Sequence, residues 1–531
     1  MNNNLLYQKL EKESSYRAFL YRYGYLITDV SDNFTNQYSF IKTWKEHQVN
    51  GIRFLIHPDQ KSYFHSAGVV TYFLIGHCYN PIKNVYEEDA ILRNLADAYS
   101  KGTNEYARYL SELTGIFISG YINENCLTVY GDASGMLMAY YGYIGKHLWI
   151  SSHADLLGNL NALEQSPYVK RLIQYRFYHL FGYSLPGDLS PYTEFKRLVP
   201  NHSLCMTDHT CIVQRFYPFE DWTELTEKYT AENRIEIISE ILQNSMQLIP
   251  QKWSKPAISL TGGCDSKTTL ACAAGYYDKY QYFSYISQES ERVDAEGAHR
   301  ICEKLGLKHS IYQIPAETCD KEEAELVRDI ISANQGNIGK LPAHELQKRI
   351  FLSELDDFDV EVKSWVSEIG RAYYHKRFNK KTFPAKPTPH YLTALYKFFV
   401  HDRKLIQDTD RIFERYIQEY LISDQLKGWN WMDLLFWEFR VSSWNGLVIT
   451  GEHRYSFDIT IPYNNRVLLE LLLTVPVEMR IQDTLYKQVR DKMNPAVDGA
   501  GVAITNLKHT SNRAKMERLY LELSTMFSLF A

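Results

Sequence analysis

The sequence has few of the features that mark secreted, membrane-spanning or nucleic-acid-binding proteins. Its 531 residues include only eight cysteines, which show neither CxxC spacing nor zinc-type pairing with histidines, so we expect reduced, buried thiols. It has no run of about 18 apolar residues, and its start, MNNNLLYQKLEKESS, lacks the basic and apolar regions of a secretory signal. The net charge of -5 opposes nucleic-acid binding by bulk electrostatics. These absences predict a cytoplasmic protein with neither a membrane nor a nucleic acid as partner.

What is present is ordinary globular composition, with 45% apolar and 23% charged residues. A chain of this length has room for roughly two to four domains, each with its own core. The function must therefore be sought in local motifs.

The stretch AISLTGGCDSKTTLACAAG, from Ala257 to Gly275, is the most informative of these. Residues 257–260 predict a short buried strand, 261–263 a glycine turn, and 266–274 a packed helix that Gly275 ends. Such a turn can direct backbone N–H groups and a helix N-terminus at an anion. The chain has no GxxxxGK[ST] pattern at this point, which argues against a P-loop. A double glycine after a strand can also be only a tight turn.

The hexapeptide TGGCDS resembles the SGGxDS pyrophosphate loop of the N-type ATP pyrophosphatases, a family that includes the C-terminal domain of asparagine synthetase. The resemblance implies that ATP binds here. Its phosphates would lie on Thr261, Gly262, Gly263 and Ser266, and Asp265 would hold Mg2+.

The first part of the chain resembles the glutaminase half of asparagine synthetase. Strand-like runs alternate with turns between residues 53 and 216, which predicts a sheet-rich domain. The matching positions are a Leu-x-Gly-x-Phe strand, an Asp-x-x-Gly strand end, a Tyr-Tyr pair and a Ser-Ser strand end, here Leu113, Gly115, Phe117, Asp132, Gly135, Tyr140, Tyr141, Ser151 and Ser152. The resemblance implies an Ntn-like αββα sandwich over residues 1–218.

The glutaminase chemistry of that family is absent from the sequence. Asn2 stands where a nucleophilic cysteine is needed, and a carboxamide cannot attack an amide carbonyl. The family's Asn-Gly-Glu corresponds to Ile75-Gly76-His77, and its Gly-Ser-Asp turn to Gly102-Thr103-Asn104. We expect this domain to be structural, with His77 a buried strand-end residue.

Residues 219–531 are expected to form an asparagine-synthetase-like ATP pyrophosphatase domain. The order strand, loop, helix, strand, helix, strand between 257 and 314 predicts a doubly wound, HUP-like parallel sheet, followed by a helical C-terminal part. In the family the second strand contacts adenine, which implicates Ser284 within YQYFSYIS. Asp294 lies at a family site position, but it can equally be an acid at the start of a helix.

Two further segments carry candidate catalytic residues through the same resemblance. SWVSEIGRAYY, from Ser364, matches the family's acidic loop, of which Glu368 survives, and Arg371 is a candidate partner for pyrophosphate. Glu368 and Arg371 can also be a plain i,i+3 ion pair. The lysine of the family's Lys-x-x-x-Arg helix, which steadies negative charge in the reaction, is assigned to Lys487, with Arg490 behind it.

The sequence as a whole predicts an AMP-forming carbon–nitrogen ligase that uses ATP and Mg2+ and hydrolyses no glutamine. Its substrates would be a small-molecule or peptide carboxylate and an amine, similar to those of the β-lactam synthetases and lasso-peptide cyclases. Two alternatives stay open: an ammonia-dependent asparagine synthetase-like enzyme, and an inactive nucleotide-binding or scaffold protein. The sequence leaves a homodimer open as well.

Overall fold

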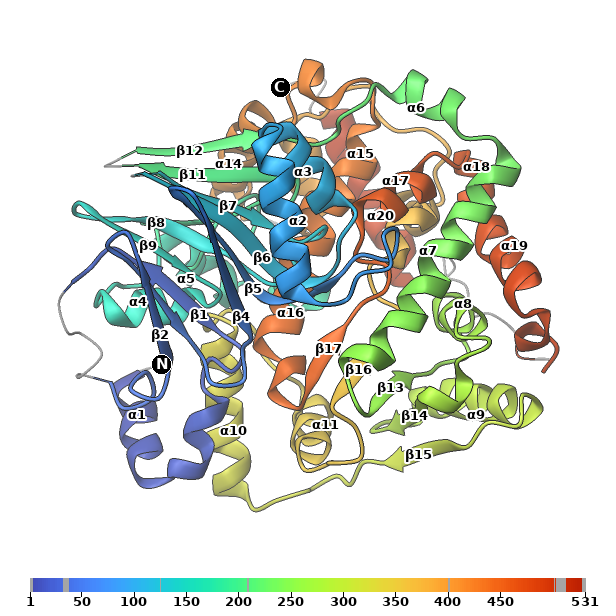
Figure 1. Cartoon of the computed structure of the whole chain (residues 1–531), viewed down its shortest axis with the longest axis horizontal. Helices are drawn as coiled ribbons and strands as arrows, with labels where there is room; N and C mark the ends of the chain where they lie inside the picture. The colour runs from blue at the N-terminus through green and yellow to red at the C-terminus, as the bar shows by residue number, and fades with distance from the viewer. Residues whose placement is uncertain are drawn as a thin grey trace.

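Two antiparallel sheets and one parallel sheet form the framework of the chain (Figure 1). The computed structural model describes residues 3–31, 38–124, 126–207, 210–399, 402–500, 502 and 512–527. The substitution at Asn2 lies outside these residues. No helix in the described ranges combines the length and the apolar character that a bilayer crossing requires.

The first sheet has the strand order β10-β8-β9-β1-β3-β2 and the second the order β12-β11-β7-β6-β5-β4. The first sheet consists of β1 (Tyr25–Thr28), β2 (Lys45–Val49), β3 (Ile52–Ile56), β8 (Tyr140–Ile144), β9 (His147–Ser151) and β10 (Phe195–Arg197). The second consists of β4 (Ser62–Ala67), β5 (Val70–Tyr79), β6 (Thr114–Asn123), β7 (Cys126–Gly131), β11 (His202–Thr207) and β12 (Thr210–Arg215). Alternate apolar side chains of both sheets, among them Ile27, Phe54, Phe73 and Ile118, meet in one core.

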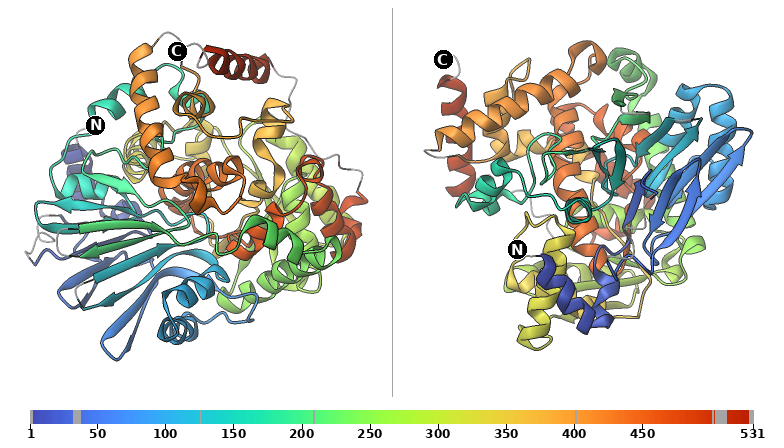
Figure 2. Two further views of the ribbon diagram at one scale, coloured as in Figure 1. Left: turned by 90° about the horizontal axis from the view of Figure 1, so that it is seen from above. Right: turned by 90° about the vertical axis from the view of Figure 1, so that its left-hand side faces the viewer.

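Helices cover the outer faces of both sheets. The helices α2 (Glu88–Ser100) and α3 (Thr103–Ser111) pack on the second sheet through Leu92, Leu95 and Leu110. On the first sheet lie α1 (Asn3–Lys12), α4 (Ala154–Leu160) and α10 (Lys321–Asn334), and Figure 2 shows α1 and α10 side by side. Each antiparallel sheet thus has helices on its outer face, with α10 of the later chain completing the cover of the first sheet.

The third sheet is parallel and has the order β15-β14-β13-β16-β17. Its strands are β13 (Pro256–Ser259), β14 (Gln281–Ile286), β15 (His309–Gln313), β16 (Val360–Val362) and β17 (Asp458–Thr460). Helices α8 (Cys264–Cys272) and α9 (Glu289–Lys304) cover one face, where Ile258 and Tyr282 point. Helix α11 (Ala343–Ser353) covers the other, where Ala257 and Phe283 point. This is the predicted doubly wound arrangement.

The remaining helices complete the chain. They are α5 (Pro167–Gln174), α6 (Trp222–Lys228), α7 (Ala231–Lys252), α12 (Tyr373–Phe378), α13 (Pro389–Tyr396), α14 (Arg403–Tyr420), α15 (Trp431–Leu435), α16 (Ser442–Gly451), α17 (Arg466–Leu473), α18 (Val477–Ile481), α19 (Thr484–Met493) and α20 (Asn512–Phe527). A π-helical segment, Phe436–Val441, joins α15 to α16.

Buried polar contacts join the two halves of the chain. Arg215, at the end of β12, donates to both carboxylate oxygens of Glu438, at 2.6 and 2.7 Å. Asn464 Nδ2 donates to Asp132 Oδ1 at 2.9 Å. The domain boundary at 218/219 falls between β12 and α6 and stays a prediction.

Candidate functional site

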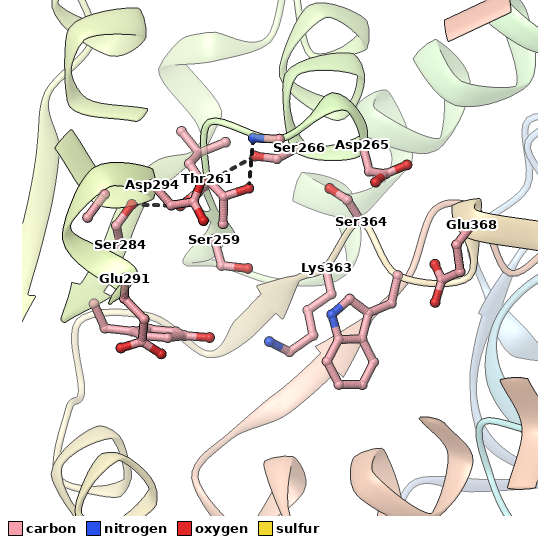
Figure 3. A pocket seen from close by; sticks show the side chains of 15 residues that line it. Ser259, Thr261, Asp265, Ser266, Ser284, Glu291, Asp294, Lys363, Ser364 and Glu368 are labelled. Atoms are coloured by element: carbon pink, nitrogen blue, oxygen red, sulfur yellow. Dashed lines mark hydrogen bonds between the residues drawn. The ribbon is translucent and has the colours of Figure 1, made fainter. Parts of the chain in front are cut away.

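A cavity of about 370 Å³ lies at the carboxyl ends of β13, β14 and β16 (Figure 3). β13 is the first strand of this sheet in the chain and lies at its centre. The next two strands of the chain, β14 and β15, extend the sheet on one side of β13, whereas β16 pairs with its other side. The loops after β13 and β16 therefore diverge at this point, which is the topological switch where open α/β sheets bind ligands. The cavity is lined by Ser259, Leu260, Thr261, Gly263, Asp265, Ser266, Ser284, Tyr285, Glu291, Asp294, Ala295, Lys363, Ser364, Trp365 and Glu368.

The glycine loop runs directly from β13 into α8, whose N-cap is Gly263. Its conformation is fixed by its own hydroxyls: the N–H of Thr261 donates to Ser266 Oγ at 2.9 Å, and the N–H of Gly263 donates to Thr261 Oγ1 at 3.2 Å. A Cβ on Gly262 would lie 3.0 Å from Val502 Cγ1. Close approach of neighbouring atoms, rather than a left-handed backbone, thus explains the glycine at 262.

Asp265 lies in the first turn of α8, directly after the glycine loop. Its Oδ1 accepts a hydrogen bond from Ser367 Oγ at 2.7 Å, and its Oδ2 pairs with Arg371. Arg371 also donates from Nε and Nη2 to the two carboxylate oxygens of Asp483, each at 2.8 Å. Burial by itself lowers the pKa of Arg371, but the hydrogen bonds to Asp483 and the charge of Asp265 outweigh it and raise the pKa, so the guanidinium stays charged.

A second acid, Glu368, lines the same cavity from a short 3-10 helix, Ser367–Arg371. Asn445 Nδ2 donates to Glu368 Oε1 at 3.0 Å. Burial raises the pKa of Glu368, and the negative charge of Asp265 raises it further. The two carboxyl groups therefore repel each other, and a cation or a proton between them is stabilised.

Lys363 supplies a cation at the opposite wall, directly after β16. Its Nζ donates to Glu361 Oε1 at 2.6 Å, and both side chains are almost fully buried. Burial lowers the pKa of the Lys363 ammonium. The sequence did not indicate Lys363. The strand before it, β16, has only three residues, and its central residue, Glu361, is charged, so the segment lacks the apolar pattern of a buried strand.

The structure brings most of the predicted site residues together. Six of them line the cavity: Thr261, Gly263, Asp265, Ser266, Ser284 and Glu368. Gly262 lies in the same loop without lining it, and Arg371 contacts the site through Asp265. Their roles toward a ligand stay predictions.

The expected position of the catalytic lysine needs correction. Lys487 lies on α19 with its side chain 65% exposed and its Nζ 2.6 Å from Asp491 Oδ2, so it does not line the cavity. Its neighbour Tyr486 is buried and donates from its hydroxyl to the carbonyl of Ser367 at 2.5 Å. One residue turns a helix by about 100°, so only Tyr486 can face the site. Moreover, Lys-x-x-x-Arg ending at Arg490 places Tyr486, not Lys487, at the lysine position.

Ser284 and Asp294 brace the loop from neighbouring elements. Ser284 Oγ donates to the carbonyl of Leu260 at 2.7 Å and lies 3.0 Å from His309 Nε2. Burial raises the pKa of Asp294, although the N–H of Gly262, which donates to its carboxylate, lowers it in part. Asp294 therefore binds the glycine loop. The alternative role as an acid at the start of a helix is not observed, because α9 begins at Glu289 and Asp294 lies beyond its first turn.

The cavity provides some of the oxygen ligands that Mg2+ prefers, in the carboxylates of Asp265 and Glu368. No three His, Cys, Asp or Glu side chains gather into a metal cluster within the described ranges. Magnesium is commonly held by one or two carboxylates together with substrate phosphates, and Asp265 and Glu368 provide two acids at one cavity. Arg371 engages Oδ2 of Asp265 and Ser367 engages Oδ1, so a metal on this carboxylate would share it with both side chains.

His77, for which the sequence predicts a structural role, contacts residues outside its own sheet. His77, near the end of β5, packs edge-on against Trp253 and lies with Nδ1 3.5 Å from Asp458 Oδ2. Burial lowers its pKa to about 3, which keeps the imidazole neutral and unable to act as an acid near pH 7.

Comparison with known proteins gives only weak likenesses. No protein-family model and no curated protein sequence matches the chain. A Bacillus subtilis glutamine phosphoribosylpyrophosphate amidotransferase complexed with ADP and GMP is 11% identical, with a TM-score of 0.22 over 69% of this chain and 73% of its own.

Two NAD synthetases are similarly distant. The ammonia-dependent enzyme of Campylobacter jejuni is 15% identical, with a TM-score of 0.18 over 43% of this chain and 96% of its own. The glutamine-dependent enzyme of Acinetobacter baumannii, in complex with ADP, is 12% identical, with a TM-score of 0.19 over 62% of this chain and 84% of its own. Superpositions this weak carry no weight, so the function must follow from the site itself.

Proposed function

We propose that the chain is an ATP-dependent, AMP-forming ligase that adenylates a carboxylate and joins it to an amine, in the manner of the asparagine synthetase family. The observation that carries the proposal is the meeting of the Thr261–Ser266 loop and the Lys363–Glu368 segment at the switch point of a parallel sheet. The first segment resembles a pyrophosphate loop, and the second brings an acid, Glu368, and a cation, Lys363, to face it.

In the first step an oxygen of the substrate carboxylate attacks the α-phosphorus of ATP. The bond from that phosphorus to the bridging oxygen breaks, and pyrophosphate leaves with the bonding electrons. The loop and the N-terminus of α8 hold the phosphates, while Lys363 offsets their charge. Mg2+ held by Asp265 and the phosphate oxygens would supply further charge neutralisation.

In the second step an amine nitrogen attacks the acyl carbon, and AMP leaves. The nitrogen must then lose a proton. Glu368, whose pKa burial raises and whose Oε1 accepts from Asn445, is the carboxylate of the cavity suited to receive it. With Lys487 facing solvent, Lys363 is the cavity's lysine and can stabilise the leaving phosphate.

The identity of the amine separates the proposal from its nearest alternative. We favour a substrate amine over free ammonia, because the sequence lacks the residues of a glutamine-fed ammonia source. If AMP formation required ammonium and accepted no other amine, an asparagine synthetase-like reaction would replace the proposal.

The test is release of AMP and pyrophosphate from ATP and Mg2+ in the presence of a small-metabolite extract of the source cell. We expect AMP only with the extract, and loss of it in Asp265→Asn. The matched control is Asp491→Asn, because Asp491 is an acid of the same type that lies 47% exposed on α19, outside the cavity. ADP in place of AMP would contradict the proposal. ATP binding without turnover would favour an inactive nucleotide-binding protein.

A further inference from the structure

A second cavity, of about 280 Å³, lies apart from the glycine loop among the C-terminal helices. Its walls come from α12, α13, the π-helical segment, α16 and α20, together with the loop at Gly182. It shares no lining residue with the first cavity. The two are nevertheless neighbours, because Trp444 lines the second cavity and the next residue, Asn445, holds Glu368 of the first.

Arg440, in the π-helical segment, lines this cavity with a guanidinium of which one nitrogen is buried and, within the described ranges, unpaired. Its Nη1 is buried and has no hydrogen-bond partner in the part of the chain that the structure describes. A buried donor without a partner is destabilising, and more so when it is charged. The Trp444 ring lies beside the guanidinium, with its centroid 4.5 Å from Cζ.

The other charged groups of the cavity do not compensate Arg440. Arg377 and Glu517 line it as well, but they pair with each other. Among the described residues no acid forms an ion pair with Arg440, so the cavity keeps one unbalanced positive charge. That charge selects an anion, and the planar guanidinium suits the two oxygens of a carboxylate.

The remaining walls favour an aromatic body attached to that anion. They include Tyr373, Phe378, Tyr396 and Trp444. The Tyr396 hydroxyl is already used, because it donates to the carbonyl of Ser184 at 2.5 Å, so this ring presents carbon to the cavity. A cavity of this size admits a small molecule, and aromatic rings pack against one another in offset or edge-on geometry.

The position of Arg440 in the π-helical segment is a second pointer to a binding role. A π-helical turn inserts one extra residue and costs hydrogen-bond geometry, and such turns occur frequently at functional sites. Here the turn ends at Val441, immediately before α16, so Arg440 and Trp444 are both directed at the cavity.

We propose that this cavity is a binding site for a small aromatic carboxylate, with the carboxylate on Arg440 and the ring among Tyr373, Tyr396 and Trp444. The site does not depend on the nucleotide cavity, and its test needs no ATP. Failure of one proposal therefore leaves the other standing.

The first experiment measures binding of phenylacetate by calorimetry, with phenylacetamide as its uncharged counterpart and inorganic phosphate as an anion without a ring. We expect phenylacetate to bind and the other two to bind at least tenfold more weakly. Arg440→Gln should lose phenylacetate binding. Arg411→Gln should keep it, because Arg411 lies on the surface of α14 with its side chain 74% exposed.

Binding that phenylacetamide or phosphate matched, or that survived Arg440→Gln, would overturn the proposal. So would the absence of any phenylacetate binding.

A second experiment uses the unaltered protein, so it stands even where Arg440→Gln does not fold. Phenylglyoxal modifies accessible arginines, and peptide mass spectrometry locates the adducts. We expect phenylacetate to protect Arg440 from modification and to leave Arg411 reactive. Equal modification of Arg440 with and without phenylacetate would contradict the assigned site.

Discussion

Arg371 joins Asp265 to Asp483, and through them the helix after the glycine loop to the turn before α19. One guanidinium thus holds two acids from segments more than 200 residues apart in sequence, and Lys376 Nζ adds a contact of 2.5 Å to Asp483. Asp265 is therefore oriented before any ligand enters, a form of preorganisation that favours phosphate chemistry.

Replacement of Asp265 by Asn should abolish most of the activity while leaving the fold intact. The amide keeps the shape of the side chain but loses the charge that pairs with Arg371 and that a metal requires. We expect AMP release to fall by about 100-fold or more. Steady-state assays with matched circular dichroism spectra check this, and activity within threefold of wild type would contradict the role of Asp265.

Substitution of Lys487 should leave stability and activity almost unchanged, whereas substitution of Lys363 should lower stability strongly. Lys487→Ala removes an exposed i,i+4 ion pair, so we expect a stability change within about 0.5 kcal/mol and unchanged AMP release. Lys363→Met leaves Glu361 buried without its partner and should cost about 3–5 kcal/mol. Urea unfolding of both variants measures the difference.

The double variant Glu361→Gln/Lys363→Met is the control for the lysine comparison. It removes both charges, so it should recover part of the stability lost in Lys363→Met. A Lys487→Ala variant that folds normally but forms no AMP would restore the role first expected of Lys487.

Stability should fall between about pH 4.5 and pH 7 because of Glu470. Burial raises the pKa of Glu470 to about 7 from an ordinary 4.5, and Tyr217 donates to it at 2.6 Å. Below pH 4.5 the carboxyl is protonated in both states and contributes nothing to the pH dependence. As the pH rises, the unfolded state releases its proton first, so the folded state loses up to about 3 kcal/mol by pH 7.

Glu470→Gln should remove this dependence. We expect the variant to melt at a higher temperature than wild type at pH 8 and at a similar temperature at pH 4.5. Glu478→Gln, at an exposed position on α18, is the control and should follow wild type at both values. A Glu470→Gln variant that is less stable than wild type at pH 8 would contradict the raised pKa.

The parts of the fold that the sequence predicts are those where local signals and packing agree. Residues 257–260 are apolar and are followed by two glycines, so the strand and its loop follow directly, and Gly275 ends the helix region with a φ of +92°. The helix itself begins two residues earlier than expected, at Cys264, because Gly263 serves as its N-cap.

The parts of the site that the sequence does not predict depend on register and on tertiary pairing. The packing of Tyr486 decides which side of α19 contacts Ser367. The next residue, Lys487, points away from the site into solvent, so an alignment that is wrong by one residue assigns the catalytic role to an exposed side chain. Lys363 and Arg440 have no sequence signal, since a buried ion pair and a π-helical turn both arise from contacts made across the fold.

The measurement that tests the central claim most directly is hydrogen–deuterium exchange with and without α,β-methylene-ATP and Mg2+. The account predicts slower exchange on nucleotide addition in two segments, 259–266 and 363–368, which meet only in the folded cavity. Unchanged exchange in both segments, with protection elsewhere or none, would contradict a nucleotide site at the switch point of the parallel sheet.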